Sequence, residues 1–541
     1  MATHRRHRKW LWTAGILLVL LATAYLAVDR IVGTALHEVA GQVKGYRIDF
    51  GSVDVAPLRR ILRIHDLEVH ADSSLQDSLN ADHFDFEADL VRLDDVDLWA
   101  LISDGVLHVR RLQVDGPVMK HFFRSLKRSD ADRDTTDVEA PAGMGLLRLD
   151  TLLIRNATLQ TRQDSGGSSA RVEDMDLFMG GLTVHVDEEL ALGIRSTRLH
   201  LAGIEAELEP FYTLTIDSLR MERPALRTLV QGLHLTPQVG PNDYGQHVDR
   251  QIELYQVDID SLQLDGFGLV RYVRDGVLRA DSVRMAGLVA SIHRDKTIPL
   301  GDQPRKPLPS EALLALEKHL HIGLLRIDRG ELHYHEKPPK GGSYGEVAFT
   351  DIAATATGIG NVPRDSLPDL FLTGDCRING QGRAHLDLRL PMGPAHSPLV
   401  SEITLYELPA TALNHLTNEL VHIDAVEGTI HGVAMQLSGD DHAASGVVDI
   451  HYEDLKVALS HEVKHAGLLS AAANLVVRAH NMPDRPGYRN GPFRVVRDQH
   501  KSVFNYLWIG LRQGLLEVIL PELAQKELKK KQEHRKRHHK Q

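Results

Sequence analysis

The chain repeats one phrase of apolar and polar residues. The phrase reads "LTIDSLRMERPAL" from Leu214 to Leu226 and returns as "LHVRRLQVDGPVM", "LRLDTLLIRNATL", "VDIDSLQLDGFGL" and "LRADSVRMAGLVA". In the aligned phrases the apolar positions fall at offsets 0, 2, 5, 7, 10 and 12, with a few Ala or Pro substitutions. A helix would favour offsets of about 3, 4, 7 and 11, whereas apolar residues two apart are typical of a strand with one buried face.

Each phrase contains gaps that break this alternation. Two polar residues, such as Asp217-Ser218, separate the apolar pairs, so an uninterrupted strand would turn its second pair to the opposite face. A β-bulge at the gap would restore the face, and so would a tight turn. The sequence leaves these two alternatives open. Both give one continuous apolar face, and its candidate lining residues are Leu214, Ile216, Leu219, Met221, Ile259, Leu262 and Leu264.

The phrase therefore predicts a mainly β protein built on a long, repetitive antiparallel sheet. At about 12 residues per strand and turn, the body of the chain would hold on the order of 35–40 strands. A flat sheet of that length is not expected, because strands twist and long sheets curl or split. The apolar face must then either pack against a second sheet or a helix, or line a groove that is filled by something apolar.

An apolar segment near the N-terminus predicts a membrane anchor. "WLWTAGILLVLLATAYLAV", residues 10–28, is 19 residues long without a charge and follows four basic residues. As a helix it would span about 28 Å, and the positive-inside rule would keep the N-terminus cytoplasmic. A cleaved signal peptide is the alternative, because Ala22-Thr23-Ala24 resembles a cleavage site. The apolar run continues to Val28 and favours a retained anchor, with anchor residues Trp10, Trp12, Leu17, Leu20 and Tyr25.

The C-terminal region changes to a helical period. Within residues 501–523 one helical stripe contains Phe504, Leu507, Trp508, Leu511 and Leu515. An amphipathic helix at a membrane interface fits this pattern, and the basic tail after it would be attracted to anionic headgroups by about 1 kcal/mol per cation. The alternative is a helix that covers the end of the sheet, followed by a solvated tail.

These patterns divide the chain into five parts and predict two further helices. One short helix starts after a Pro-rich break at 302–309, with Ser310 as its N-cap, and the second extends from Pro409 to Leu420. A polar segment at 127–145 predicts a loop. The predicted parts are a basic stub and anchor (1–30), N-terminal sheet repeats (31–300), a C-terminal sheet (301–500), the amphipathic helix (501–523) and the basic tail (524–541).

Composition narrows the classes of function. The net charge is −11 although both ends are basic, so the body is acidic, which argues against a nucleic-acid-binding groove. The single cysteine, Cys376, excludes an intramolecular disulfide. His319, His321, His333 and His335 come nearest to a metal site, but no acidic or cysteine ligand has a characteristic spacing.

No catalytic motif emerges from the sequence. Gly341-Gly342-Ser343-Tyr344-Gly345 matches G-x-S-x-G, yet a strand-like segment follows it where a nucleophile elbow needs a helix. We therefore expect no enzyme activity, no metal and no cofactor.

Three stretches resemble the AsmA-like family of Gram-negative envelope proteins. The first is the basic N-terminal anchor followed by "GYRIDFGSVDVAPLRRILRIHDLEVH". The second is the phrase with a Pro before its last apolar pair, as in "LHVRRLQVDGPVM". The third runs from Leu405 to Leu459, where a short helix precedes a strand that contains Gly428, and a later strand ends in "DLKV".

This resemblance implies a β-groove shaped like a folded taco. The groove would lie in the periplasm, anchored by a single pass in the inner membrane, and would support outer-membrane integrity. Larger relatives look like bridge-like lipid transfer proteins, in which acyl chains lie along the groove. The implied partners are phospholipid on the apolar face and the inner membrane, with anionic headgroups at the basic tail; no nucleic acid is expected, and protein partners are unknown.

Two alternatives stay open. The chain of 541 residues is shorter than the relatives thought to bridge both membranes, so it would reach part of the way, act as an oligomer, or hold lipid without bridging. The other reading is a non-enzymatic envelope scaffold or regulatory protein whose apolar face is filled by its own side chains.

Overall fold

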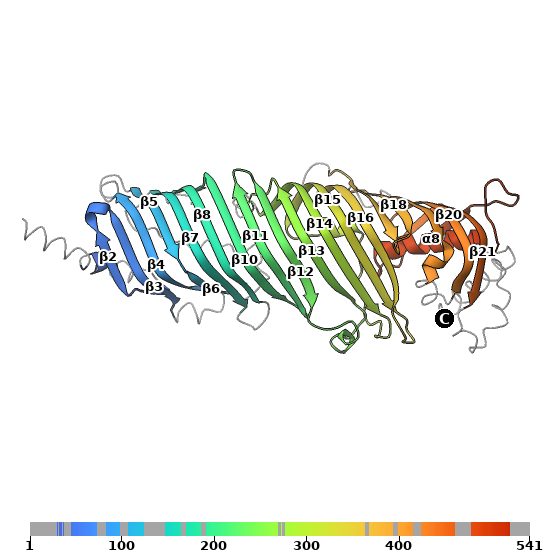
Figure 1. Ribbon diagram of the computed structural model, residues 1–541, viewed down its shortest axis with the longest axis horizontal. Helices are drawn as coiled ribbons and strands as arrows, with labels where there is room; N and C mark the ends of the chain where they lie inside the picture. Colours follow the sequence, from blue (N-terminus) through green and yellow to red (C-terminus); the bar gives the residue numbers. More distant parts are fainter. Residues whose placement is uncertain are drawn as a thin grey trace, which may run out of the picture. The chain divides into compact units, whose positions relative to one another are not determined.

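A computed structural model describes residues 30, 32–34, 36, 45–72, 83–97, 106–123, 146–163, 169–185, 191–268, 272, 276–362, 367–392, 399–414, 423–459 and 478–519. The chain forms two compact units, Met1–Val230 (unit 1) and Gln231–Gln541 (unit 2). The predicted boundary at residue 300 lies within unit 2. The described residues are mainly β, as the repeated phrase predicted (Figure 1).

Unit 1 is built on long strands that follow one another in the sheet. Its strands are β1 (Tyr46–Asp49), β2 (Ser52–Ala56), β3 (Ile61–Ala71), β4 (His83–Asp97), β5 (Val106–Asp115), β6 (Val118–Phe123), β7 (Leu146–Gln163), β8 (Ser169–His185), β9 (Ala191–Gly193), β10 (Ser196–Leu208) and β11 (Tyr212–Arg223). A 3-10 helix, η1 (Pro57–Arg59), joins β2 to β3, and β12 (Arg227–Pro237) crosses the boundary between the units.

Unit 2 contains the remaining strands and the helices. The strands are β13 (Glu253–Asp265), β14 (Val277–Asp295), β15 (His319–Lys337), β16 (Gly345–Gly360), β17 (Leu370–Ile378), β18 (Gly382–Leu390), β19 (Leu399–Pro409), β20 (Ile423–Gly439), β21 (Ala443–Leu459) and β22 (Gly491–Val496). The helical elements are η3 (Tyr244–Gln246), α5 (Pro309–Leu314), η4 (Ala410–Leu413) and α8 (Val503–Ile519). From β13 to β22 each strand pairs with the next.

The pairing is mixed, and the prediction of an antiparallel sheet was wrong at two places. β7 runs parallel to β5 and β6, and β15 runs parallel to β14. Parallel neighbours need a long crossover connection, whereas a hairpin gives antiparallel ones. Between β14 and β15 the segment Lys296–Lys318, here called the strap, returns the chain to the end of the sheet at which β14 began. The polar segment 127–145 belongs to the other crossover and lies outside the described residues.

Four of the five phrases lie wholly or largely on one long strand, which is why the predicted number of strands was too high; the phrase from Leu107 to Met119 is divided between β5 and β6. The described residues contain 22 strands, and the longest reach 19 residues. Bulges lie at the gaps: Asn156 in β7 and Arg329 in β15 have φ of 50° and 55°, and the pairing register shifts beside each. At Asp217-Ser218 the register between β10 and β11 does not shift: Ala202 pairs with Ser218, Ile204 pairs with Ile216, and Gly203 between them has φ of 60°. The gaps at Asn156 and Arg329 therefore adopt the bulge, whereas Gly116-Pro117 interrupts the strand between β5 and β6.

Two shorter predictions need correction. α5 begins at Pro309 with Leu308 as its N-cap, so Ser310 lies inside the first turn instead of capping it. The Leu308 backbone N–H donates to Glu311 Oε2 at 3.0 Å, so the acid of the first turn takes part of the expected capping role. The second predicted helix is η4, which is only four residues long, and residues 415–420 lie outside the described residues.

Candidate functional site

The apolar residues of unit 1 line up from strand to strand. Residues directly opposite one another on paired strands lie on the same face of the sheet. Two such columns cross seven strands of unit 1. The first column is Ile64, Val91, Val114, Ile154, Leu177, Leu199 and Met221, and the second is Val69, Phe86, Met119, Leu159, Val172, Ile204 and Ile216.

Little of the described protein covers these columns. Among the described residues of unit 1, Ala88, Val91 and Val114 form a buried apolar cluster, and Val172 and Met221 of the columns are also buried. Within the described parts of unit 1, the elements other than strands are η1 and the helical residues between Arg30 and Leu36. An open hollow of about 410 Å³ lies over β7, β8, β10 and β11, and its lining includes Ile154, Leu177 and Met221 together with neighbouring charged side chains. This face is the candidate functional site of unit 1.

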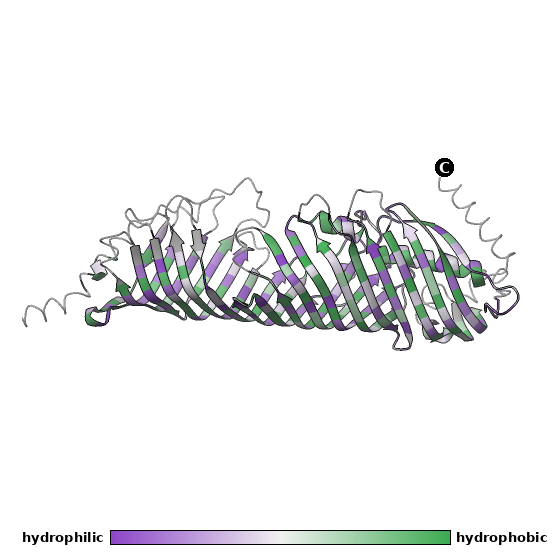
Figure 2. Cartoon of the chain, turned by 90° about the horizontal axis from the view of Figure 1, so that it is seen from above, coloured by the Kyte–Doolittle hydropathy of each residue, from purple (hydrophilic) through white to green (hydrophobic). Residues whose placement is uncertain are grey.

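Unit 2 carries the same arrangement over more strands. One column runs from β13 to β22 as Leu264, Val283, Leu325, Ala356, Leu372, Leu388, Ser401, Leu437, Gly446 and Phe493. Beside it runs Leu262, Met285, Ile327, Ala354, Gly374, Leu386, Ile403, Met435, Val448 and Gly491. Figure 2 shows the alternation of hydrophobic and hydrophilic residues along these strands.

The last strands of unit 2 are covered by α8. The helix contacts β20, β21 and β22, and it packs in a core cluster that includes Met435, Val448 and Phe493. Met435 and Val448 are 0% exposed, whereas Leu262, Met285 and Ile327 in the same column are half-buried. The core cluster also contains Leu388 on β18 and Leu399 on β19. The apolar face of unit 2 therefore has a covered part at β18–β22, where α8 contacts the last three strands, and, among the described residues, an open part that starts at β13.

The sheet of unit 2 is curled, as two contacts of the strap residue Lys306 show. Lys306 Nζ lies 2.8 Å from Glu253 Oε2 on β13, while the backbone N–H of Lys306 donates at 2.7 Å to Gln499 O, just after β22. A flat sheet with about 4.8 Å per strand would hold its first and last strands about 40 Å apart. The two contacts of one residue therefore require that the sheet bend back on itself.

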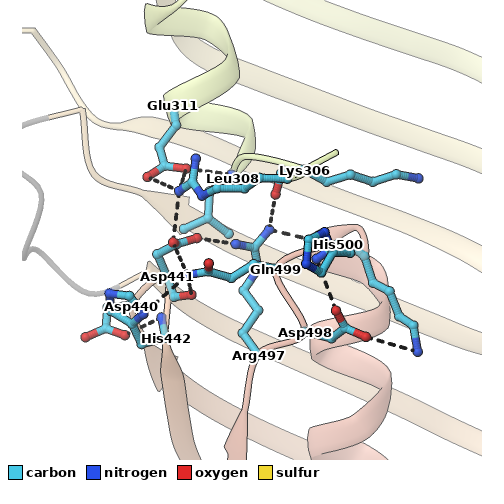
Figure 3. A network of polar contacts seen from close by, with 12 residues as sticks. Lys306, Leu308, Glu311, Asp440, Asp441, His442, Arg497, Asp498, Gln499 and His500 are labelled. Atoms are coloured by element: carbon cyan, nitrogen blue, oxygen red, sulfur yellow. Dashed lines mark hydrogen bonds and ion pairs between the residues drawn. The ribbon is translucent and has the colours of Figure 1, made fainter. Parts of the chain in front are cut away.

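A polar network fixes the strap beside α8. The Arg497 side chain, which is 1% exposed, pairs with Asp441 and also donates to the Lys306 carbonyl oxygen. Arg305 pairs with the same carboxylate at 2.9 Å and with Glu311 at 2.8 Å. Figure 3 shows these side chains meeting between α5, the β20–β21 hairpin and the segment that leads into α8. Burying this pair is tolerable because each charge has a partner.

The predicted lining residues divide between the two units. Leu214, Ile216, Leu219 and Met221 lie on β11, opposite Ala206, Ile204, Leu201 and Leu199. Ile259, Leu262 and Leu264 lie on β13, opposite Leu288, Met285 and Val283. All seven thus have apolar partners, and only Met221 and Ile259 are fully buried. The phrase therefore predicted which residues lie on the apolar face, but it does not indicate which part of that face is covered.

The residues predicted to contact a membrane lie largely outside the described residues. Trp10, Trp12, Leu17, Leu20 and Tyr25 are not among them, and neither is the basic tail at 524–541. Across the part of the chain that the structure describes, no helix combines the length and apolarity needed to cross a membrane.

The predicted interfacial helix packs on the sheet, as the second of its two interpretations expected. Its buried face contains Val503, Tyr506, Leu507, Gly510, Gly514 and Val518. Of the predicted stripe, Leu507 is therefore buried; Trp508, Leu511 and Leu515 are half-buried, and Phe504 is 65% exposed. Leu511 and Leu515 pack against the core cluster, so the predicted stripe overlaps the packed face, which also contains the two glycines. The spacing Gly510-x-x-x-Gly514 is a known signal for close packing and could have located that face.

The other candidate chemistry does not converge. The His293 and His335 rings stack at 4.3 Å, and burial, followed by the nearby His335, lowers the pKa of His293 to about 4. Across the described ranges, no three His, Cys, Asp or Glu side chains are grouped as a metal site. Ser343 lies exposed in the connection between β15 and β16, so strand–turn–strand replaces the elbow geometry. Cys376 is half-buried, and burial raises the pKa of its thiol.

Comparison with known proteins adds no relative. No family model matches the chain, and no curated protein matches its sequence.

Proposed function

We propose that the protein is an AsmA-like, membrane-anchored carrier that holds phospholipid by its acyl chains on the apolar faces of its sheets. The body would lie in the periplasm, with the segment 10–28 in the inner membrane. The protein would support envelope integrity without enzyme activity or a cofactor. In this proposal Leu214, Ile216, Leu219, Ile259 and Leu264 contact acyl chains.

The continuous apolar columns are the observation that carries the proposal. The first column of unit 1 joins apolar partners over seven strands without a polar residue between them. Most of its residues are half-buried, and each CH₂ of a ligand that leaves water to contact them adds about 0.8 kcal/mol to the free energy of binding. An acyl chain has the shape and chemistry to cover such a row, and the binding needs no external energy source.

The part of unit 2 covered by α8 supports the choice of occupant. The same columns that are open at β13 meet the apolar face of a helix at β20–β22. The columns thus pack against an apolar helix face where the chain provides one. In the open part, the acyl chain of a lipid could make the same kind of apolar contact.

The same observation favours a second candidate for the end of unit 2. There the face is filled by the protein's own side chains, as expected for an envelope scaffold with a closed core. A scaffold would extend this filling over the whole face, through segments outside the described residues or through a partner protein. The two proposals therefore differ in what touches the open rows.

Photocrosslinking from neighbouring positions tests the proposal. Benzoylphenylalanine is placed at Leu219, on the apolar face, or at Glu205 on the neighbouring strand β10, which is exposed and pairs with the polar Arg171 and Thr215. The full chain is irradiated in native membranes, purified and weighed by mass spectrometry. A phospholipid-sized adduct at position 219 and not at 205 is the expected result. A protein adduct at 219, or equal lipid adducts at both positions, contradicts lipid carriage.

A further inference from the structure

One end of the apolar face of unit 2 is closed by elements that fit it closely. Gly514 of α8 lies so near the sheet that a Cβ there would come within 2.3 Å of Val448 Cγ2. At Gly510 a Cβ would lie 2.9 Å from Phe493 Cε2. Contacts this close leave no layer of lipid between the helix and the sheet. Any acyl chain on these strands would have to displace α8.

Both ends of α8 are held in place by polar contacts. At its C-terminal end Arg489 donates to the Val518 carbonyl oxygen at 2.9 and 3.2 Å, and the Arg478 backbone N–H donates to Ile519 O at 3.1 Å. These bonds satisfy carbonyl groups that a helix otherwise leaves without partners. Arg497 precedes the N-terminal end of the helix, and its buried side chain pairs with Asp441. The helix is therefore clamped at both ends, and the clamps have to be broken before it can move.

The strap continues this closure from α8 toward β13. Leu308 of the strap is buried in the same core cluster as α8. Lys306 reaches Glu253 on β13, and Lys296 pairs with Glu336 on β15. The strap thus crosses the curled sheet on the side that carries α8, and its ion pairs connect the first strands to the last ones. Together the strap and α8 form a wall at one end of the open part.

We propose that α8 and the strap form the closed end of the lipid-binding face of unit 2: acyl chains bind along β13–β16 and stop where Leu372 of β17 packs against the core cluster. The proposal rests on lipid carriage as the function of the face. It assigns the binding site to Leu262, Met285, Ile327 and their neighbours, and it excludes Met435, Val448 and Phe493 from contact with lipid. Lipid then enters and leaves unit 2 away from α8.

Labelling with a photoreactive lipid tests this. The full chain is reconstituted with phosphatidylethanolamine that carries a diazirine in one acyl chain, irradiated, digested and mapped by mass spectrometry. Adducts are expected on β13–β16, and none on the inner residues of β18–β22 or on α8. Adducts on Met435, Val448 or Phe493 overturn the closed end while leaving lipid carriage intact. An absence of adducts from the whole apolar face of both units instead overturns lipid carriage itself.

A wedge variant provides a second arm. Gly514→Leu places a side chain where a Cβ already overlaps Val448, so α8 should lift from the sheet. The control Gly240→Leu adds the same side chain where the nearest heavy atom to a Cβ is 3.6 Å away. Labelling should extend to Met435 and Val448 in the wedge variant only. Unchanged labelling, with α8 released as judged by protease cleavage at 497–502, overturns the proposal. If the wedge variant does not fold, the map of the unaltered chain decides.

Discussion

The apolar face of unit 1 and the end of the face in unit 2 are made from the same kind of column but differ in what lies on them. In unit 1, Ile154, Leu177 and Leu199 are half-buried, although Val91, Val114 and Met221 of the same column are buried. At β20–β22 the corresponding side chains are buried beneath α8. The repeated phrase therefore determines which face of the sheet is apolar. Whether that face becomes a core or stays a surface depends on a separate segment with a matching apolar side.

The largest difference between the two regions should come from a buried charge. Val448→Asp puts a carboxylate under α8 at a site that is 0% exposed, where it has no partner, and should cost about 3–5 kcal/mol. Leu219→Asp is the matched variant in unit 1, where the half-buried side chain can reach water, so the fold should persist while lipid adducts are lost.

Proteolysis read by mass spectrometry measures the two variants unit by unit. We expect unit 2 to be cleaved in the first variant and unit 1 to stay resistant in the second. Cleavage of unit 1 in Leu219→Asp would instead mean that this face is a closed core, as the scaffold proposal requires.

Two methionines give a matched pair of cavity variants. Met435→Ala removes a side chain that is 0% exposed and should destabilise unit 2 by about 2–5 kcal/mol. Met175→Ala, on β8 and half-buried between Leu201 and Ala157, should cost about 1 kcal/mol or less, because it leaves little enclosed space. Denaturant titration with a probe in each unit measures both. Equal losses would remove the distinction between covered and open parts.

A smaller effect is expected from a single added methyl group. Gly514→Ala forces a Cβ against Val448 and should destabilise the seating of α8 by about 1–3 kcal/mol through overpacking. Gly240→Ala is the control, since its added Cβ makes only an ordinary contact. Hydrogen exchange in the α8 backbone measures the local effect. Unaltered protection in Gly514→Ala would show that the helix packs more loosely than the contacts indicate.

The smallest expected effect is a loss of stability of the β20–β21 turn at acidic pH. The Ala443 backbone N–H, followed by that of His442, lowers the pKa of the Asp440 carboxyl at the β20–β21 turn. A lowered pKa in the folded state contributes stability above the unfolded pKa, and that contribution is lost as the pH falls through the folded value. The turn should thus exchange faster below about pH 4, and Asp440→Asn should weaken this dependence. An identical acid profile in the variant would contradict the assignment.

The sequence predicted the strand content and the apolar face because both follow from local spacing. Leu214, Ile216, Leu219 and Met221 were placed on one face by their spacing together with an assumed bulge or turn at Asp217-Ser218, and the register pairs every one with an apolar residue. The bulges at the gaps were one of two open alternatives. Residues such as Asn156 and Arg329 give no local signal strong enough to decide between them, since a left-handed backbone at these residue types depends on the neighbouring strand.

What the sequence did not predict depends on distant residues. The parallel pairing of β14 and β15 follows from the path of the strap, which a loop-like composition does not reveal. The pairing of Arg497 with Asp441 joins residues 56 positions apart, and nothing in either local stretch marks it. The packed face of α8 was predicted in part, through Leu507, Leu511 and Leu515. Gly510 and Gly514, which allow the closest approach, were missed because apolar side chains were counted and small ones were not.

The strap has a consequence for the order in which unit 2 can assemble. Arg497 meets Lys306 across 191 positions of sequence, so this contact can form only after β15–β22 have been added to the sheet. Contacts of such large separation make folding slow, and until they form, the inner residues of β20–β22 have no cover. The seating of α8 is thus a late event that reports completion of unit 2. A chain stalled before it would expose Met435, Val448 and Phe493 and become a target for aggregation or quality-control proteolysis.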